Sequence, residues 1–370
     1  MVNTYPKTYF KNLDALRFCA FLLIFLDHVI FSTNYNESSS SLHRFFNQHF
    51  VIGIDFYTIL SGFLISWIIL EEYKFTSKFN LSNFWLKRTL RIWPLYFILI
   101  FIGMVLVWAA RNILGENVNS LPPFGWLFTF TLNFYIIKYG QGFLFFIAFL
   151  WTVSVEEQFY ITIGLALKWL RKAFVPVCIL LIAVSLVFRF IYLHQPLNLF
   201  FNSLSWIGTF ASGGLLAYFC INRGKVFEKM KNIPLWLTSL VYILFILNLA
   251  FYTQIYASDG MAVWERLTAS LFLSFLLFEQ NFSEKHLFQL GNIKFMNYLG
   301  KISYGLFCYH GLVILLYEQS TKNISWVNTP LAVFLINPVV IFVFTIGISA
   351  LSYQYLERPI MSLRNKYKTT

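Results

Sequence analysis

Hydrophobic residues fall in long blocks that short polar stretches separate along almost the whole chain. Each block has roughly 18 to 25 residues, which at about 1.5 Å per helical residue crosses a ~30 Å hydrocarbon layer. A transmembrane barrel would instead alternate apolar and polar positions in short segments, whereas residues 177–187 are almost continuously apolar. The pattern predicts an all-α polytopic membrane helix bundle that forms a single integral membrane domain over residues 1–370.

Ten of these blocks are predicted to be transmembrane helices. They lie at 13–33, 49–71, 92–112, 146–169, 173–193, 201–221, 234–255, 262–280, 298–318 and 331–354. A further apolar segment, 124–140, is short, is bounded by Pro122-Pro123 and Gly140, and contains polar residues. If it crossed the bilayer, every later loop would invert and the basic loop 223–231 would lie outside, against the positive-inside rule. We therefore predict a re-entrant or interfacial segment there, and both termini in the cytoplasm.

Composition and charge agree with this topology. The chain is 58% hydrophobic and only 12% charged, about half the charge expected of a soluble domain. Its formal net charge of +12 comes from short basic runs between apolar blocks, which indicates cytoplasmic loops rather than a nucleic-acid surface. All but six of the 28 Lys and Arg residues then lie at the inner side. The six are Arg44, Arg111, Lys138, Arg189, Arg266 and Lys322.

Several ionisable residues are predicted to lie at membrane depth, where they are costly and usually functional. Arg17 and His28 are eleven residues apart, so they share one helix face about 16 Å apart along the axis. A snorkelling arginine and a buried, hydrogen-bonded histidine would explain that pair equally well. Counting residues from the basic helix ends, however, places further polar side chains in one mid-membrane layer. They are Ser61, Glu156, Glu157 and His310.

A basic cluster precedes the third predicted helix. Arg88 and Arg91 are three residues apart and would share a face if this stretch is helical, with Lys87 beside them. Guanidinium groups bind phosphate with two parallel hydrogen bonds, so the cluster could dock a phosphate-rich molecule. Ordinary anchoring of a membrane protein at its cytoplasmic edge is the alternative, and charge alone leaves both open.

Six short motifs in a fixed order resemble the membrane acyltransferase-3 family, which includes bacterial polysaccharide and O-antigen O-acetyltransferases. The first is Asn12-Leu13-Asp14-Ala15-Leu16-Arg17 with His28 eleven residues after Arg17. The others are Asp55-Phe56-Tyr57 with Ser61-Gly62-Phe63-Leu64, 84–96, 151–160, Ser303-Tyr304-Gly305-Leu306 with His310, and Glu357-Arg358-Pro359. Tyr57 and Thr152 stand where Phe and Ser are more usual in the family. Some members carry an added extracytoplasmic esterase-like domain, which we do not expect here.

The resemblance implies that an acetyl or other short acyl group passes from cytoplasmic acyl-CoA to a hydroxyl of a cell-surface glycan. Acetyl-CoA would be a donor substrate, with no permanently bound cofactor and no metal. The expected acyl-CoA-binding residues are Arg17, Lys87, Arg88 and Arg91, and the expected catalytic residues are His28, Glu156 and Glu157. His28 would accept the proton of the acceptor hydroxyl, or would itself be acylated, and one of the two glutamates would orient it. A supporting polar layer would contain Asp27, Asp55, Ser61, Tyr304 and His310.

A transporter or flippase for a polar or lipid-linked glycan is the rival reading, because buried charges also form proton relays and substrate paths. Both readings predict a multi-pass protein of the bacterial cytoplasmic (inner) membrane, surrounded by lipid and without a nucleic-acid partner. The sequence leaves the acceptor glycan and the oligomeric state open, a homo-oligomer included.

Overall fold

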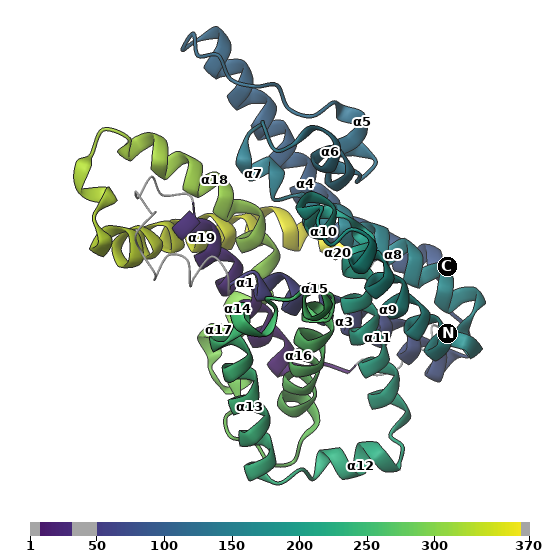
Figure 1. The fold of residues 1–370 in the computed structure, drawn as a ribbon. Coiled ribbons are helices and arrows are strands. Elements are labelled where there is room, and N and C mark those ends of the chain that lie inside the picture. The colour runs from purple at the N-terminus through teal and green to yellow at the C-terminus, as the bar shows by residue number, and fades with distance from the viewer. Residues whose placement is uncertain (1–7, 32–49, 364–370) are drawn as a thin grey trace.

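The computed structural model describes residues 8–31 and 50–363, and this part of the chain consists of helices and connecting loops without a strand (Figure 1). The first half contains α1 Lys11–Phe31, α3 Ile52–Thr76, α4 Leu81–Asn112, α5 Phe124–Phe128, α6 Leu132–Tyr139, α7 Phe145–Ala148, α8 Trp151–Trp169, the 3-10 turn η1 Arg171–Ala173 and α9 Phe174–Ile191. The middle contains α10 Pro196–Phe201, α11 Ser203–Asn222, α12 Lys225–Lys231, α13 Leu235–Ala250, α14 Tyr252–Ile255, α15 Asp259–Ala262 and α16 Glu265–Phe282. The last part contains η2 Leu290–Asn292, α17 Lys294–Lys301, α18 Ser303–Thr321, η3 Ser325–Asn328, the π-helical η4 Ala332–Ile336, α19 Asn337–Ser352, the π-helical η5 Tyr353–Glu357 and α20 Arg358–Ser362.

Several helices are long and apolar enough to cross a membrane. Within the described residues there are five such helices, or up to seven when two bent pairs are each taken as one span. The bent pairs are α12 with α13, which meet at 87°, and α17 with α18, which meet at 75°. Three further helices occupy predicted spans but carry more charge: α1 with 21 residues, α8 with 19 and α16 with 18. The chain is therefore a multi-span helical membrane protein.

The centre of the bundle is the contact between α3 and α11. Of the five helices that qualify alone, α3 is the most buried, at 78% of its apolar window. A Cβ atom on Gly62 would lie 2.1 Å from the carbonyl oxygen of Phe210, and one on Gly213 would lie 2.2 Å from that of Ile59. Only glycine allows the two backbones to approach so closely, as small residues do at membrane helix interfaces. Gly62 in the second motif thus has a packing role.

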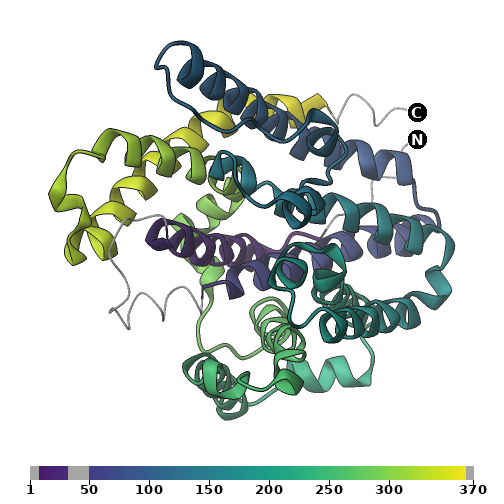
Figure 2. The same ribbon diagram turned by 45° about the horizontal axis from the view of Figure 1, so that its top comes forward.

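The outer limits of several helices differ from the predicted spans. The block 146–169 is divided into α7 and α8, and the block 331–354 continues through η5 into α20, with α18 and α19 side by side in Figures 1 and 2. The basic cluster that precedes the third predicted span lies inside a helix, because α4 begins at Leu81 rather than near residue 92. The condition under which Arg88 and Arg91 share a helix face is therefore met.

The segment 124–140 returns to the side from which it starts. It contains two helices of 5 and 8 residues, too short to cross a bilayer, with Phe130 between them at φ 54°. The side chain of Asn119, before this segment, donates a hydrogen bond to the carbonyl of Gly142, after it. This bent geometry agrees with the re-entrant or interfacial segment that the sequence predicts there.

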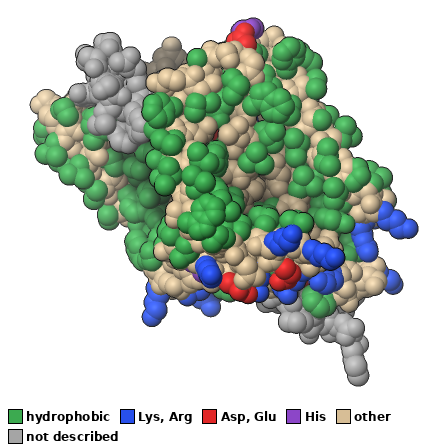
Figure 3. Space-filling view, turned by 60° about the horizontal axis from the view of Figure 1, so that its bottom comes forward, with side chains coloured by type: hydrophobic (Ala, Val, Ile, Leu, Met, Phe, Trp, Pro, Cys, Tyr) green, Lys and Arg blue, Asp and Glu red, His purple; other side chains and the backbone are tan. Residues whose placement is uncertain are grey.

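Charge is distributed unevenly over the surface. Figure 3 shows Lys and Arg side chains along one edge below a broad hydrophobic face. Exposed basic residues gather at the end of α8, in η1 and around α12: Lys168, Arg171, Lys172, Arg223, Lys225 and Lys229. Large apolar side chains stay exposed on α9, α13 and α19, for example Leu180 at 60%. Such a surface suits a lipid environment bordered by an anionic headgroup layer.

Candidate active site

Arg88 and Arg91 lie inside helix α4, because this helix begins at Leu81, before both residues. The side chain of Asn80 caps the helix by accepting a hydrogen bond of 3.0 Å from the backbone of Asn83. The backbone N–H of Asn80 in turn donates to Glu72 at 3.1 Å, which ties the start of α4 to the end of α3. Arg88 and Arg91 then lie one helical turn apart on the same face.

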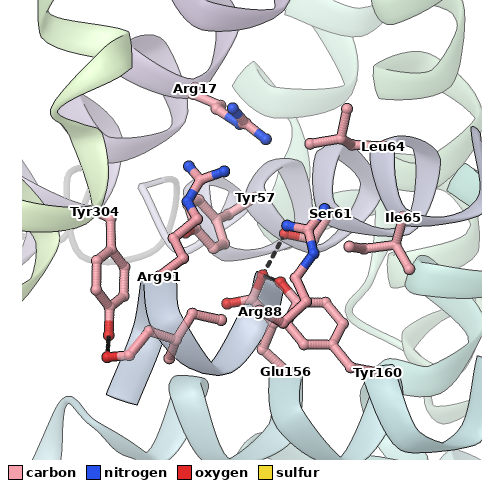
Figure 4. A pocket seen from close by; sticks show the side chains of 11 residues that line it. Arg17, Tyr57, Ser61, Leu64, Ile65, Arg88, Arg91, Glu156, Tyr160 and Tyr304 are labelled. Atoms are coloured by element: carbon pink, nitrogen blue, oxygen red, sulfur yellow. Dashed lines mark hydrogen bonds between the residues drawn. The ribbon is translucent and has the colours of Figure 1, made fainter. Parts of the chain in front are cut away.

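One cavity contains six of the predicted site residues. Arg17 from α1, Ser61 from α3, Arg88 and Arg91 from α4, Glu156 from α8 and Tyr304 from α18 all line it. Tyr57, Leu64, Ile65, Ile92 and Tyr160 complete the lining. The three guanidinium groups extend into this space (Figure 4). The empty space among these residues is about 380 Å³, including its opening to solvent.

The cavity carries more positive than negative charge. Three guanidinium groups face a single lining carboxylate, Glu156, and Arg17 also has Asp14 at 3.7 Å. Among the described residues, neither Arg88 nor Arg91 forms an ion pair with a carboxylate. The guanidinium of Arg88 instead lies over the ring of Tyr160, 5.7 Å from its centre. Unpaired cations in a partly buried cavity favour an anionic ligand.

Glu156 is held by two hydroxyl groups. Its Oε1 accepts a hydrogen bond of 2.7 Å from Ser61 and another from Tyr160, which lies four residues further along α8 on the same face. Across the cavity, Tyr304 donates to the backbone carbonyl of Ile92 at 2.7 Å and so joins α18 to α4. Ser61 and Glu156 were predicted to lie in one layer and here form a direct contact, whereas Tyr57 and Tyr160 were not identified as lining residues.

His28 meets His310 rather than a glutamate. Nδ1 of His28 lies 2.8 Å from Nε2 of His310, and the ring of Phe149 stacks on His28 with centres 3.7 Å apart. In the described part of the chain, neither Glu156 nor Glu157 hydrogen-bonds His28. The expectation that a glutamate orients His28 was wrong, because Glu156 is engaged by Ser61 and Tyr160 in the separate arginine cavity.

The remaining predicted residues lie apart from both groups. Lys87 does not line the arginine cavity, since it neighbours Arg88 on a different face of α4. Oδ1 of Asp27 and Oε1 of Glu157 are buried and have no hydrogen-bond partner among the described residues. Asp55 forms an ion pair of 3.1 Å with Arg266.

A second ion pair, whose arginine is buried, lies close to the first and was not predicted. Arg189 contacts Glu265 at 3.0 Å and also donates to the backbone carbonyls of Ala262 and Val263. Glu265 and Arg266 are adjacent at the start of α16, so the two pairs form one network. The signal was available, because Arg189 and Arg266 are charged residues inside apolar blocks and fall outside the basic loops.

The sequence is similar to those of known bacterial O-acetyltransferases. Residues 10–353 match the sequence profile of Acyl_transf_3, described as an acyltransferase domain. The chain is 23% identical to the peptidoglycan O-acetyltransferase OatA of Listeria monocytogenes, over 96% of this chain and 56% of that protein. It is also 23% identical to the O-acetyltransferase OatA of Staphylococcus aureus, over 96% of this chain and 58% of that protein. The chain thus spans a little over half the length of these relatives. No solved structure shows a significant match.

Proposed function

Since the chain belongs to the acyltransferase-3 family, we propose that it transfers an acetyl or other short acyl group from cytoplasmic acyl-CoA to a hydroxyl of an extracytoplasmic glycan. Peptidoglycan is the acceptor that we propose, because relatives named as peptidoglycan O-acetyltransferases align with 96% of the chain or more. The observation that carries the proposal is the cavity in which Arg17, Arg88 and Arg91 face a single carboxylate.

The donor binds in this cavity. Coenzyme A is rich in phosphate, and each guanidinium can hold a phosphate through two parallel hydrogen bonds. Arg88 and Arg91 have no described carboxylate to release before an anion binds. Lys87 is left out of the binding set because it lies outside the lining.

His28 is the group that activates the acceptor. It lies on the same helix as Arg17, about 16 Å further along the axis. A donor anchored by its phosphates at Arg17 would therefore extend its acyl end toward His28. A neutral imidazole can then accept the proton of an acceptor hydroxyl, which is the usual task of a general base.

Ten transmembrane helices with both chain ends on the cytoplasmic side complete the proposal. The seven candidate spans and the charged helices α1, α8 and α16 occupy the ten predicted positions. The backbone N–H of Thr8 donates to Glu71 near the end of α3, and α20 packs against α4. Both described ends of the chain therefore lie near the short α3–α4 connection, on one side. We place this side in the cytoplasm of a bacterium, with the bundle as a single domain of the inner membrane and lipids around it.

Incubation of the purified protein with labelled acetyl-CoA and peptidoglycan glycan strands tests the proposal. Release of free thiol that depends on the glycan, with label appearing on the glycan, supports acyl transfer. The His28→Ala variant is the matched negative control. Movement of glycan across a vesicle membrane without thiol release would instead favour a transporter or flippase.

A further inference from the structure

The ring of His28 is held in one plane. Its plane lies within 1° of the Phe149 ring and within 7° of the His310 ring. The centres of the two histidine rings are 5.1 Å apart, and their nearest nitrogens are 2.8 Å apart. One hydrogen bond between ring nitrogens and one aromatic stack thus define where the nitrogens of His28 lie.

The partner of His310 on its other side shows which nitrogen carries hydrogen. Nδ1 of His310 hydrogen-bonds the backbone carbonyl oxygen of Phe307. A carbonyl oxygen only accepts, so Nδ1 of His310 is the donor and carries the hydrogen.

His310 is neutral in this setting. Its side chain is 0% exposed and is surrounded by the rings of Phe21, Phe25, Phe149 and Phe307. No described carboxylate hydrogen-bonds or pairs with it, and a charge buried without a partner is strongly disfavoured. A neutral imidazole has one N–H, so Nε2 of His310 carries the lone pair.

The hydrogen between the two histidines therefore belongs to His28. Its Nδ1 donates to Nε2 of His310, and Nε2 is left as the only basic atom of the neutral His28 ring. We propose that His310 is a positioning residue that holds His28 in the Nδ1–H tautomer and so makes Nε2 of His28 the proton acceptor. This inference rests on the proposed function only because the proposed function identifies the proton that Nε2 accepts as that of the acceptor hydroxyl.

The same hydrogen bond serves both protonation states of His28. The acceptor O–H bond breaks as its proton moves to Nε2, and the oxygen bonds to the thioester carbonyl carbon. The C–S bond then breaks, the electron pair leaves on sulfur, and the proton on Nε2 passes to sulfur to give the free thiol. Charged His28 still donates from Nδ1 to His310, so the pair needs no rearrangement during the reaction.

Two substitutions at His310 separate positioning from packing. In His310→Gln the amide oxygen can take the place of Nε2 and accept from His28, whereas His310→Leu keeps a similar size without an acceptor. We expect the Leu variant to lower kcat by about 100-fold or more and the Gln variant to keep more than about a tenth of it. KM for acetyl-CoA should change little in either variant, because the arginine cavity is separate. Equal losses in both variants, or full activity of the Leu variant, would overturn the inference.

A spectroscopic measurement tests the tautomer without any activity. In protein labelled with ¹⁵N-histidine and reconstituted in bilayers, NMR distinguishes protonated from bare ring nitrogens. We expect a protonated Nδ1 and a bare Nε2 for both His28 and His310, with signals assigned through His28→Ala and His310→Gln. In His310→Leu the His28 signals should show protonated Nε2.

The two results separate the two hypotheses. If His28 carries hydrogen on Nε2 in the unmodified protein, the positioning role fails even when the protein transfers acyl groups. If the Nδ1–H tautomer is found and no acyl transfer occurs under any condition, the proposed function fails while the histidine pair stands.

Discussion

Nη1 of Arg266 lies 3.1 Å from Oδ1 of Asp55, and both residues are almost completely buried. The guanidinium carbon also lies 3.3 Å from the centre of the Trp206 ring. Arg266 thereby joins α16 to α3 and α11, the two helices at the centre of the bundle. Because Asp55 belongs to the second sequence motif and lies outside the arginine cavity, we assign this part of the motif to assembly of the bundle.

We expect Asp55→Leu to destabilise the protein by about 3–5 kcal/mol, because it leaves the Arg266 charge buried without its partner. Combining Asp55→Leu with Arg266→Met should recover much of the loss, since an apolar pair of similar size needs no compensation. Thermal unfolding in detergent measures both effects through Tm. If Asp55→Leu alone is as stable as the unmodified protein, the ion pair contributes nothing to stability.

Arg88→Ala and Arg91→Ala should each weaken coenzyme A binding by about 10- to 100-fold, the usual range for a charge-assisted hydrogen bond. Lys substitution should restore little, because an ammonium group lacks the two-pronged geometry of a guanidinium. Titration calorimetry measures the affinity, and higher salt should reduce it in the unmodified protein. Lys87→Ala is the matched control beside Arg88. Unchanged affinity in both Arg variants would leave these residues as membrane anchors.

Glu156→Gln should raise the affinity for coenzyme A, because it removes the one carboxylate that lines the cavity, whose negative charge repels phosphate. A gain of about 1 kcal/mol, or roughly fivefold in Kd, is reasonable for one charge at this range. The amide oxygen can still accept from Ser61 and Tyr160, so the cavity should keep its shape. Glu157→Gln serves as the control because that side chain does not line the cavity. Weaker binding in Glu156→Gln would mean that the carboxylate itself contacts the donor.

His28→Ala should reduce acyl transfer by a factor of about 100 to 10,000, the range expected for loss of a general base. Coenzyme A affinity should stay within about twofold, because His28 does not line the arginine cavity. Thiol release under saturating acetyl-CoA measures the first quantity, and calorimetry measures the second. Normal turnover in a well-folded variant would remove His28 from the mechanism.

Residue spacing predicted part of the site because helices have a fixed rise and repeat. Counting turns placed Ser61, Glu156, Glu157 and His310 in one layer with His28 near it, and the structure has two separate contacts there, Ser61 with Glu156 and His28 with His310. The count could not show that the pairs are separate, since it gives depth and not the rotation of one helix against another. That rotation depends on side-chain packing between helices, such as the Gly62 and Gly213 contacts.

The pattern of apolar residues also did not predict the bends and breaks in the helices. The 75° bend between α17 and α18 occurs at Ile302, between Gly300-Lys301 and Ser303, inside the block 298–318 that was predicted as one straight span. The missed Tyr160 is different, because its place four residues after Glu156 could have indicated the contact. Contacts within one helix can therefore be predicted from residue spacing, whereas the angles between helices cannot.

Cysteine labelling across the membrane tests the sidedness. Asn117, Gln141 and Asn222 are all exposed, so single cysteines there can react in a background without the four native ones. We expect Asn117→Cys and Gln141→Cys to react with an impermeant reagent from outside, and Asn222→Cys only from inside. The first two should agree because the contact between Asn119 and Gly142 brings their loops together on one face.

The position of Asn222 makes the assay decisive, because it ends α11 beside the basic helix α12. If Gln141→Cys reacts from inside while Asn117→Cys reacts from outside, segment 124–140 crosses the membrane and the Asn119 contact does not exist in the bilayer. If all three labels are inverted together, the fold stands but the arginine cavity opens to the outside. Cytoplasmic acyl-CoA could not then reach Arg88 and Arg91, and the proposed direction of transfer would fail with the topology.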